Sequence, residues 1–383
     1  MSSNWLKKHP LRSRSMVKQL KPDSLRQGEE LQQAQAPASP MLPYRRPKFL
    51  HGVQSVKEPG KRPIYCPARD RLLPWKTGYA EVINVEKSEF NEDQATCCKI
   101  SMRRRETSLE ENQEWLSLCS NQDEMIGQEM KATNQAAGCT ALAVLYLQGK
   151  LFVANAGDSR AVLVQKHSIM ALSSEFTPET ERQRIQHLAF LNPKLLADEF
   201  TRFEFPRRLK RGDVGHKVLY RDYFMAGWGY KTVEKDDLKY PLIHGHGKQT
   251  RLLGTLAVSR GLGDHQLKVT DTNVKVKPFL SCIPKVNVLD FALNDVKEDD
   301  VLVLATDGLW EILSNEEVAQ IVRSFLEDNK MDLYRFSELA KCLVQKARGM
   351  RNGHQWTLEN NNPASYDDIS VFVIPLNNRD RES

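Results

Sequence analysis

The order of apolar and polar positions divides the chain into a weakly patterned beginning and a well patterned remainder. Residues 1–61 carry many Lys, Arg, Gln, Ser and Pro residues and few periodic apolar positions. Burial of apolar surface there cannot offset the entropy lost on ordering. The stretch is therefore predicted to be a basic, disordered tail. From Trp75 the pattern changes, and residues 72–378 are predicted to form one folded domain.

Alternating or wholly apolar runs predict six strands in this domain. They are Tyr79–Asn84, Leu142–Leu147, Leu151–Ala154, Ala161–Val164, Val301–Ala305 and Ile369–Pro375. Tight turns separate the second, third and fourth of them, which predicts a meander of three antiparallel strands.

Helical spacing of apolar residues predicts four helices. They are Asp123–Thr133, Glu179–Leu191, Val318–Phe325 and Phe336–Ala347. Ser314 followed by Glu317 forms a capping box before the third of them. Strands and helices come in groups and do not alternate one by one. The predicted fold class is therefore α+β, with antiparallel sheets layered against helices.

Residues 192–249 interrupt this pattern with a long irregular insert. The insert mixes Arg, Lys and Gly with nine aromatic residues and shows no clean period. Long irregular segments in folded domains usually carry function or lie on the surface. Its aromatic content predicts a compact, flap-like unit beside the active-site edge of the domain.

Composition narrows the classes of partner. A net charge of +6, with 55 Lys and Arg against 49 Asp and Glu and no concentrated basic stripe, argues against nucleic acid as a partner. No apolar run is long enough to span a bilayer, so no membrane partner is expected. The seven scattered cysteines indicate a reducing compartment, and a cytoplasmic or nuclear location is expected.

Carboxylates stand at strand ends or tight turns in three places. The three are Asn91-Glu92-Asp93, Thr306-Asp307-Gly308 and Tyr366-Asp367-Asp368. Carboxylates gathered from several strand ends form the hard oxygen ligands that Mg²⁺ and Mn²⁺ take. Acidic residues also favour turns for local reasons. Spacing alone leaves both interpretations open.

Six segments together resemble the successive motifs of one enzyme family, in that family's order. The segments are Phe90–Gln94, Gly138–Ala141, Ala154–Arg160, Leu253–Asp264, Ala305–Trp310 and Ser365–Ser370. The family is the PPM (type 2C) metal-dependent protein serine/threonine phosphatases. The resemblance extends from about Trp75 to Pro375. The insert and Phe176–Arg182 are most similar to its H, J and M subgroup, and to the M member above all.

The resemblance implies a fold, a reaction and a set of residues. The implied fold is a central β-sandwich of two antiparallel sheets flanked by helices. The implied activity is hydrolysis of phosphoserine and phosphothreonine in phosphoprotein substrates by a water molecule activated by Mg²⁺ or Mn²⁺. By resemblance, Glu92 holds one metal ion, Asp307 and Asp367 hold a second, and Asp158 and Glu311 lie at a weaker third.

One motif of the family is missing. No Asp-Gly-His-Gly-Gly turn is present, and Asp307-Gly308 is the only Asp-Gly pair in the sequence. The family's bridging Asp and its catalytic His therefore have no counterpart, and no catalytic residue remains beyond the metal ligands. Asp123 or Glu124 could take the bridging role instead. The family's phosphate-gripping Arg falls on Ser88.

An internal deletion near Ser120/Asn121, as a splice variant would carry, accounts for the gap and predicts that part of one helical layer is missing. The sequence then leaves three hypotheses open. In the first, the chain is a metal-dependent phosphatase with weak activity. In the second, it is a catalytically impaired pseudophosphatase that acts as a binding or regulatory protein. In the third, it is an unstable splice product without a function.

Overall fold

The computed structural model describes residues 46–53, 61–88, 90–100, 111–134, 136–294, 296–297 and 299–376. The chain divides after Pro40, and every element below belongs to the unit that begins at Met41.

The end of the predicted flexible tail packs against the domain. Residues Lys48–Leu50 form a short 3₁₀ helix, η1, and Leu50 is fully buried beside Tyr65 and Tyr79. The ring of Phe49 lies edge-on to that of Tyr79, with centroids 4.9 Å apart, and such burial offsets the entropy of ordering. The prediction of a disordered tail up to residue 61 is therefore wrong for residues 46–53. The rest of the tail up to residue 60 lies outside the described residues.

The larger of the two main sheets has six antiparallel strands. Their spatial order is β1 (Ile64–Tyr65), β2 (Gly78–Val82), β19 (Ile369–Pro375), β16 (Val301–Ala305), β6 (Arg160–Val164) and β7 (Ile169–Ala171). Strand β16 lies at the centre, and all five of its residues are buried. The wholly apolar run that predicted β16 is typical of a strand covered on both faces.

The second main sheet has three antiparallel strands, β4 (Ala141–Leu147), β5 (Lys150–Ala156) and β15 (Lys285–Asp290), with β5 in the middle. Leu151 of β5 packs in one buried cluster with Leu163 of β6 and Leu302 of β16. The two sheets therefore face each other across a shared apolar core, and the predicted α+β sandwich is confirmed.

The predicted three-stranded meander is only partly right. Strands β4 and β5 form an antiparallel hairpin, but β6 pairs with β16 and β7 in the other sheet. The chain changes sheets at Gly157, whose φ of 148° is one that residues with a Cβ rarely adopt. Four of the five residues of β6 are buried, so it belongs in the sheet that is covered on both faces.

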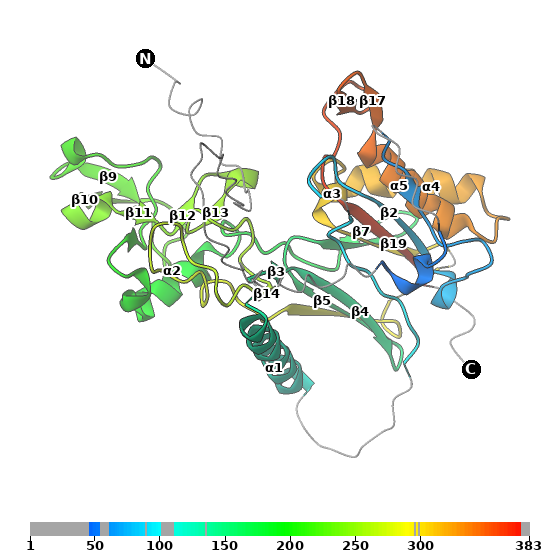
Figure 1. Cartoon of the computed structure of the whole chain (residues 1–383), viewed down its shortest axis with the longest axis horizontal. Coiled ribbons are helices and arrows are strands. Elements are labelled where there is room, and N and C mark those ends of the chain that lie inside the picture. Colours follow the sequence, from blue (N-terminus) through cyan, green and yellow to red (C-terminus); the bar gives the residue numbers. More distant parts are fainter. Residues whose placement is uncertain are drawn as a thin grey trace, which may run out of the picture. The chain divides into compact units, whose positions relative to one another are not determined.

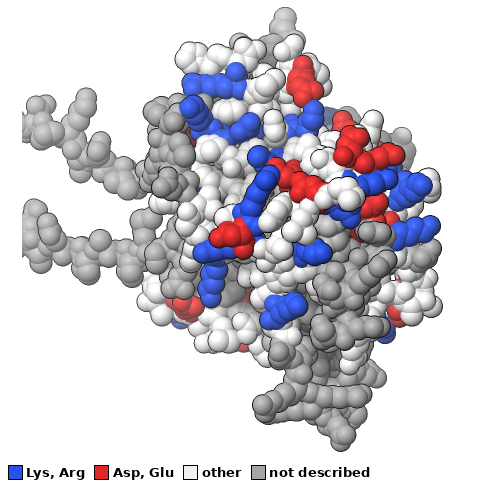
Figure 2. Space-filling view, turned by 90° about the vertical axis from the view of Figure 1, so that its right-hand side faces the viewer, with Lys and Arg blue, Asp and Glu red and all other residues white. Residues whose placement is uncertain are grey.

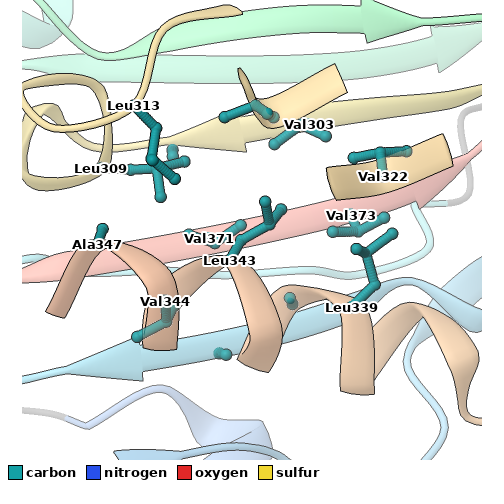
Figure 3. Packing of buried hydrophobic residues seen from close by; sticks show 14 of the residues in the cluster. Val303, Leu309, Leu313, Val322, Leu339, Leu343, Val344, Ala347, Val371 and Val373 are labelled. Carbon is teal, nitrogen blue, oxygen red and sulfur yellow. The ribbon is translucent and has the colours of Figure 1, made fainter. Parts of the chain in front are cut away.

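Two long helices cover the outer face of the six-stranded sheet (Figure 1). They are α4 (Asn315–Asp328) and α5 (Arg335–Arg348), and the short α3 (Asp307–Trp310) precedes them. Ser314 caps α4, and the predicted capping box with Glu317 is present. Figure 3 shows Leu343 of α5 beside Val371 of β19 and Leu339 beside Val373, in the largest apolar cluster of the described residues.

The remaining helices differ in their starts from the predictions. Helix α1 runs over Glu111–Ala132, twelve residues earlier than predicted, and passes through positions 120 and 121 without a break. Helix α2 (Arg182–Leu191) begins three residues later than predicted. Short elements complete the frame: η2 (Pro74–Lys76), β3 (Gly138–Cys139), β13 (Arg251–Leu252), β14 (Leu262–Gly263), β17 (Met350–Asn352) and β18 (Gln355–Thr357).

The insert at residues 192–249 consists of short strands and 3₁₀ turns. These are η3 (Pro193–Leu196), β8 (Phe200–Thr201), η4 (Arg211–Asp213), β9 (Lys217–Tyr220), β10 (Gly229–Thr232), η5 (Lys235–Leu238), β11 (Tyr240–Pro241), β12 (Ile243–His244) and η6 (Gly247–Gln249). Phe200 and Leu242 are buried together with Ile185 of α2 and with Phe279. The insert thus shares an apolar core with neighbouring parts of the domain.

The face seen in Figure 2 shows no large patch of one charge. On that face Lys and Arg side chains are interspersed with Asp and Glu. Among the described residues, every helix is too short or too polar to cross a bilayer.

The outer face of the three-stranded sheet is apolar but less well covered. Leu145, Phe152 and Val288 lie side by side across β4, β5 and β15. In the described part of the chain none of the three belongs to a buried apolar cluster. Val288 is 52% exposed. Apolar surface of this kind commonly marks a contact face.

The two faces of this sheet predict different costs of truncation. Leu151→Ala, on the inner face, is expected to lower the free energy of unfolding by about 2–5 kcal/mol, because it empties space in a closed core. Leu145→Ala, on the outer face, is the matched control and should cost about 1 kcal/mol. Urea unfolding followed by circular dichroism measures both. Equal losses would show that the outer face is packed as tightly as the core.

Candidate functional site

The register of β16 brings three of the predicted site residues to one edge of the six-stranded sheet. The last residue of β16 pairs with the first residue of β6 and with the third residue of β19. Asp307 follows the end of β16 by two residues, while Asp158 and Asp367 precede the starts of β6 and β19 by two residues. Because neighbouring strands run in opposite directions, these positions meet at the same end of the sheet.

Strand β2 adds a fourth segment to this edge. Its last residue pairs with the first residue of β19, so the loop that follows β2 leaves the sheet beside Asp367. That loop carries Glu92. The structure thus brings the segments of Glu92, Asp158, Asp307 and Asp367 together, although they are distant in the sequence.

Asp368 is a buried carboxylate that holds the β2 loop in place. It is 2% exposed and accepts hydrogen bonds from the backbone N–H of Asn84 at 2.9 Å, from the Asn84 side-chain amide at 2.9 Å and from the N–H of Glu92 at 3.2 Å. Burial raises the pKa of Asp368, and these hydrogen bonds oppose the rise. Sequence reasoning assigned this residue no role.

Arg62 ties the same loop to the start of β19 from the other side. Its guanidinium is buried and donates hydrogen bonds to the carbonyl oxygens of Ile83 at 2.7 Å, Ser365 at 2.6 Å and Asp367 at 2.7 Å. Burial, and then the nearby charge of Arg348, lower the pKa of Arg62 to about 10. The backbone on both sides of Asp367 is therefore fixed.

Lys87 is the residue at this edge that sequence reasoning missed. Asn84 Oδ1 accepts the backbone N–H groups of Lys87 at 2.9 Å and Ser88 at 3.0 Å, which forms an Asx turn. From that turn the Lys87 ammonium reaches Glu92 Oε2 at 2.7 Å and Asp367 Oδ1 at 3.3 Å. By resemblance, the family's phosphate-gripping arginine falls on Ser88. The one hint of a role for Lys87 was that this cation directly precedes that position.

Asp307 has the most perturbed carboxyl group among the predicted ligands. Burial, followed by the negative charges of Asp158, Asp367 and Glu311, raises the pKa of Asp307 to about 7. The turn after it requires glycine, because a Cβ on Gly308 would lie 2.0 Å from the carbonyl oxygen of Asp368. The close backbone approach holds Asp307 against the start of β19.

Asp158 lies beside this group in the turn between β5 and β6. Burial raises the pKa of Asp158, and the charges of Glu175, Glu311 and Asp367 add to the effect. The carboxylates of Asp158, Asp307, Glu311 and Asp367 are therefore close enough to repel one another.

These residues do not fit a completed metal centre. In the described ranges, no three His, Cys, Asp or Glu side chains are grouped so that they could hold a metal ion. The carboxylates of Glu92 and Asp367 both contact an ammonium group instead. The metal-ligand roles of Glu92, Asp307 and Asp367, and of Asp158 and Glu311 at a third site, stay predictions.

Asp123 and Ser88, the positions considered in connection with the missing groups, have other partners. The carboxylate of Asp123 pairs with the Lys277 ammonium and lies 3.1 Å from His265 Nε2. It also accepts the N–H of Gly263 at 2.8 Å. These contacts engage Asp123 elsewhere, and the suggestion that Asp123 or Glu124 takes the bridging role stays a prediction. Ser88 is engaged within its own loop, where its hydroxyl donates to the carbonyl oxygen of Phe90 at 2.5 Å.

Comparison with known proteins identifies the family to which the chain belongs. The family model described as "Protein phosphatase 2C" matches residues 81–191 and 242–355, which leaves out most of the insert. The chain is 49% identical to "Protein phosphatase 1M" of Mus musculus over 439 residues, which cover 90% of this chain and 94% of that protein. It is 38% identical to "Protein phosphatase 1J" of Mus musculus over 451 residues, covering 91% of this chain and 89% of that protein.

A third relative matches a shorter part. The chain is 54% identical to "Protein phosphatase 1H" of Xenopus tropicalis over 262 residues, which cover 68% of this chain and 51% of that protein. The alignments with the 1M and 1J proteins are longer than the 383 residues of this chain. Those relatives therefore contain residues for which this chain has no counterpart.

Asp307 predicts a pH-dependent stability in metal-free protein. Its folded pKa of about 7 exceeds the ordinary 3.8, so the folded state binds more protons than the unfolded state between these values. The contribution of Asp307 to the free energy of unfolding therefore falls as the pH rises through this window and is constant above it. Asp307→Asn removes the penalty. The variant should gain on the parent by up to about 1.4 kcal/mol per pH unit between about pH 5 and pH 7.

Urea unfolding in EDTA across this pH range provides the measurement. Asp328→Asn, at the exposed end of α4, is the control and should leave the pH dependence of the parent unchanged. A stability difference between Asp307→Asn and the parent that stays constant over the range would contradict the assignment of Asp307 as a buried, repelled carboxyl group.

Proposed function

Because the chain belongs to the protein phosphatase 2C family, by family a protein serine/threonine phosphatase, we propose that it binds phosphoserine and phosphothreonine proteins at the acidic edge. We propose further that hydrolysis there depends on Mg²⁺ or Mn²⁺ and is weak in this chain. The observation that carries the proposal is the convergence of four motif segments at the end of β16, with a lysine ammonium between two of the carboxylates.

Weak metal binding follows from the charges that remain. Two divalent cations a few Å apart repel strongly, and shared anionic oxygens between them make the pair tolerable. The sequence holds no Asp-Gly-His-Gly-Gly turn to supply a bridging carboxylate. The carboxylates of Asp307, Asp158 and Glu311 repel one another. Their proximity does not make any of them a ligand shared by two metal ions.

An internal deletion is part of the proposal. The alignments that exceed the length of this chain support it, since they require gaps in this chain. We place the junction near Ser120/Asn121, where helix α1 now runs through without interruption. The partly exposed apolar row on the outer face of the three-stranded sheet, Leu145, Phe152 and Val288, agrees with a covering segment that the chain lacks.

A binding or regulatory role is the second candidate. The insert keeps a packed core and reaches the acidic edge, where the Lys248 ammonium donates to the carbonyl oxygen of Glu311 at 2.9 Å. A chain with this surface and little turnover would act as a pseudophosphatase that holds phosphoproteins. The expected cytoplasmic or nuclear location belongs to the same proposal.

One assay separates the two candidates. Purified chain is incubated with Mn²⁺ and a phosphothreonine peptide, and phosphate release is compared with that of Asp307→Asn. Turnover that the substitution abolishes establishes the enzyme. Peptide binding without turnover, unchanged in Asp307→Asn, establishes the binding protein.

Restoring the missing segment is predicted to recover both metal binding and activity. The segment that the mouse 1M relative carries is inserted between Ser120 and Asn121, and Mn²⁺ binding is measured by calorimetry. The restored chain should bind two ions tightly and hydrolyse the peptide about 10²-fold faster or more, since it regains a bridging carboxylate and a proton donor. Two tight sites in the chain as it stands would refute the proposed deficiency.

A further inference from the structure

One lysine ammonium lies between two carboxylates that come from different segments of the chain. Lys87 Nζ is 2.7 Å from Glu92 Oε2 and 3.3 Å from Asp367 Oδ1. Lys87 and Glu92 belong to the loop after β2, whereas Asp367 precedes β19. The ammonium therefore connects the loop after β2 with the segment before β19, at the edge where the family's metal ligands were predicted.

The placement of this ammonium is built into the fold. The Asx turn at Asn84 fixes the backbone of Lys87, and Asn84 is itself held by the buried carboxylate of Asp368. Asp368 also accepts the backbone N–H of Glu92. One buried side chain thus positions the start and the end of the loop, and with them the lysine and its first partner.

The second partner is fixed independently. Arg62 donates to the carbonyl oxygen of Asp367, and Asp367 Oδ1 accepts the backbone N–H of Asp368 at 2.9 Å. Asp367 and Glu92 would repel each other without a cation between them. A single ammonium that contacts both removes this repulsion without any bound ion.

An ordinary surface ion pair is the alternative interpretation. The side chains of Lys87 and Glu92 are 52% and 50% exposed, and exposed pairs usually contribute little. Two observations separate this case from an ordinary pair: one ammonium serves two carboxylates, and the loops that carry all three groups are held by buried hydrogen bonds.

We propose that Lys87 is the built-in cation of the acidic edge, which holds Glu92 and Asp367 together in metal-free protein and which a divalent ion must displace to reach both carboxylates. The inference rests on the proposed function, because it adds a second cause of weak metal binding to the missing bridging carboxylate. It differs from that proposal in assigning the effect to a residue that is present.

Calorimetric titration with Mn²⁺ of the full chain and of Lys87→Gln tests this proposal. Glutamine keeps a polar side chain of similar length but carries no charge, so the variant should bind Mn²⁺ at least about tenfold more tightly than the parent. Lys87→Arg retains the cation and should bind as weakly as the parent. Thermal melting in EDTA should show a lower Tm for Lys87→Gln, and added Mn²⁺ should raise this Tm by more than it raises that of the parent.

Two controls isolate the role of Lys87. Lys248→Gln removes the same charge at the same edge, where Lys248 contacts the backbone of Glu311 and neither of the two carboxylates. Its Mn²⁺ affinity should stay within about threefold of the parent. Lys346→Gln removes a surface ion pair of equal length, 2.7 Å to Glu359, and should leave the response to Mn²⁺ unchanged.

The outcomes separate this inference from the proposed function. If Lys87→Gln binds Mn²⁺ no more tightly than Lys248→Gln, or if neither binds measurably, Lys87 is not the competing cation. The affinity of the parent chain alone decides the proposed deficiency, whereas the ratio between Lys87→Gln and its controls decides the role of Lys87.

Discussion

The antiparallel register of β16 with β6 and β19 is the constraint on which the acidic edge depends. Because β16 ends where its two neighbours begin, Asp307 emerges beside the turns that carry Asp158 and Asp367. The apolar sequence of β16 fixes this register, since a slip by one residue would exchange its two buried faces. The packing of α5 on one face and of β5 across the other therefore helps to position these carboxylates.

Buried polar groups translate that register into a defined arrangement of charges. Arg62 and Asp368 hold the β2 loop to the start of β19 through hydrogen bonds that are largely shielded from water. The repulsion between neighbouring carboxylates at this edge is reduced in two different ways. Glu92 and Asp367 share the ammonium of Lys87, whereas burial and neighbouring carboxylates raise the pKa of Asp307.

Sequence patterns predicted the elements whose environment is uniform and missed those that tertiary contacts decide. The bounds of β16 and β19 were predicted correctly, because runs of buried apolar residues identify themselves. Strand β6 was assigned to the wrong sheet, since its apolar run indicates burial but does not reveal that it pairs with β16 and β7. The contacts of Lys87 and Asp368 were not predicted, because each has a partner in a distant segment and polar residues next to turns have many possible roles.

The account joins two deficits at one edge, a missing bridging carboxylate and a lysine that already neutralises two of the remaining carboxylates. A crystal of the chain as it stands, grown in millimolar Mn²⁺ and measured at the manganese absorption edge, tests their combined effect most directly. The account predicts that the Lys87 ammonium remains between Glu92 and Asp367 and that no pair of manganese peaks is present at this edge. Two strong anomalous peaks a few Å apart, with Lys87 turned away, would contradict it.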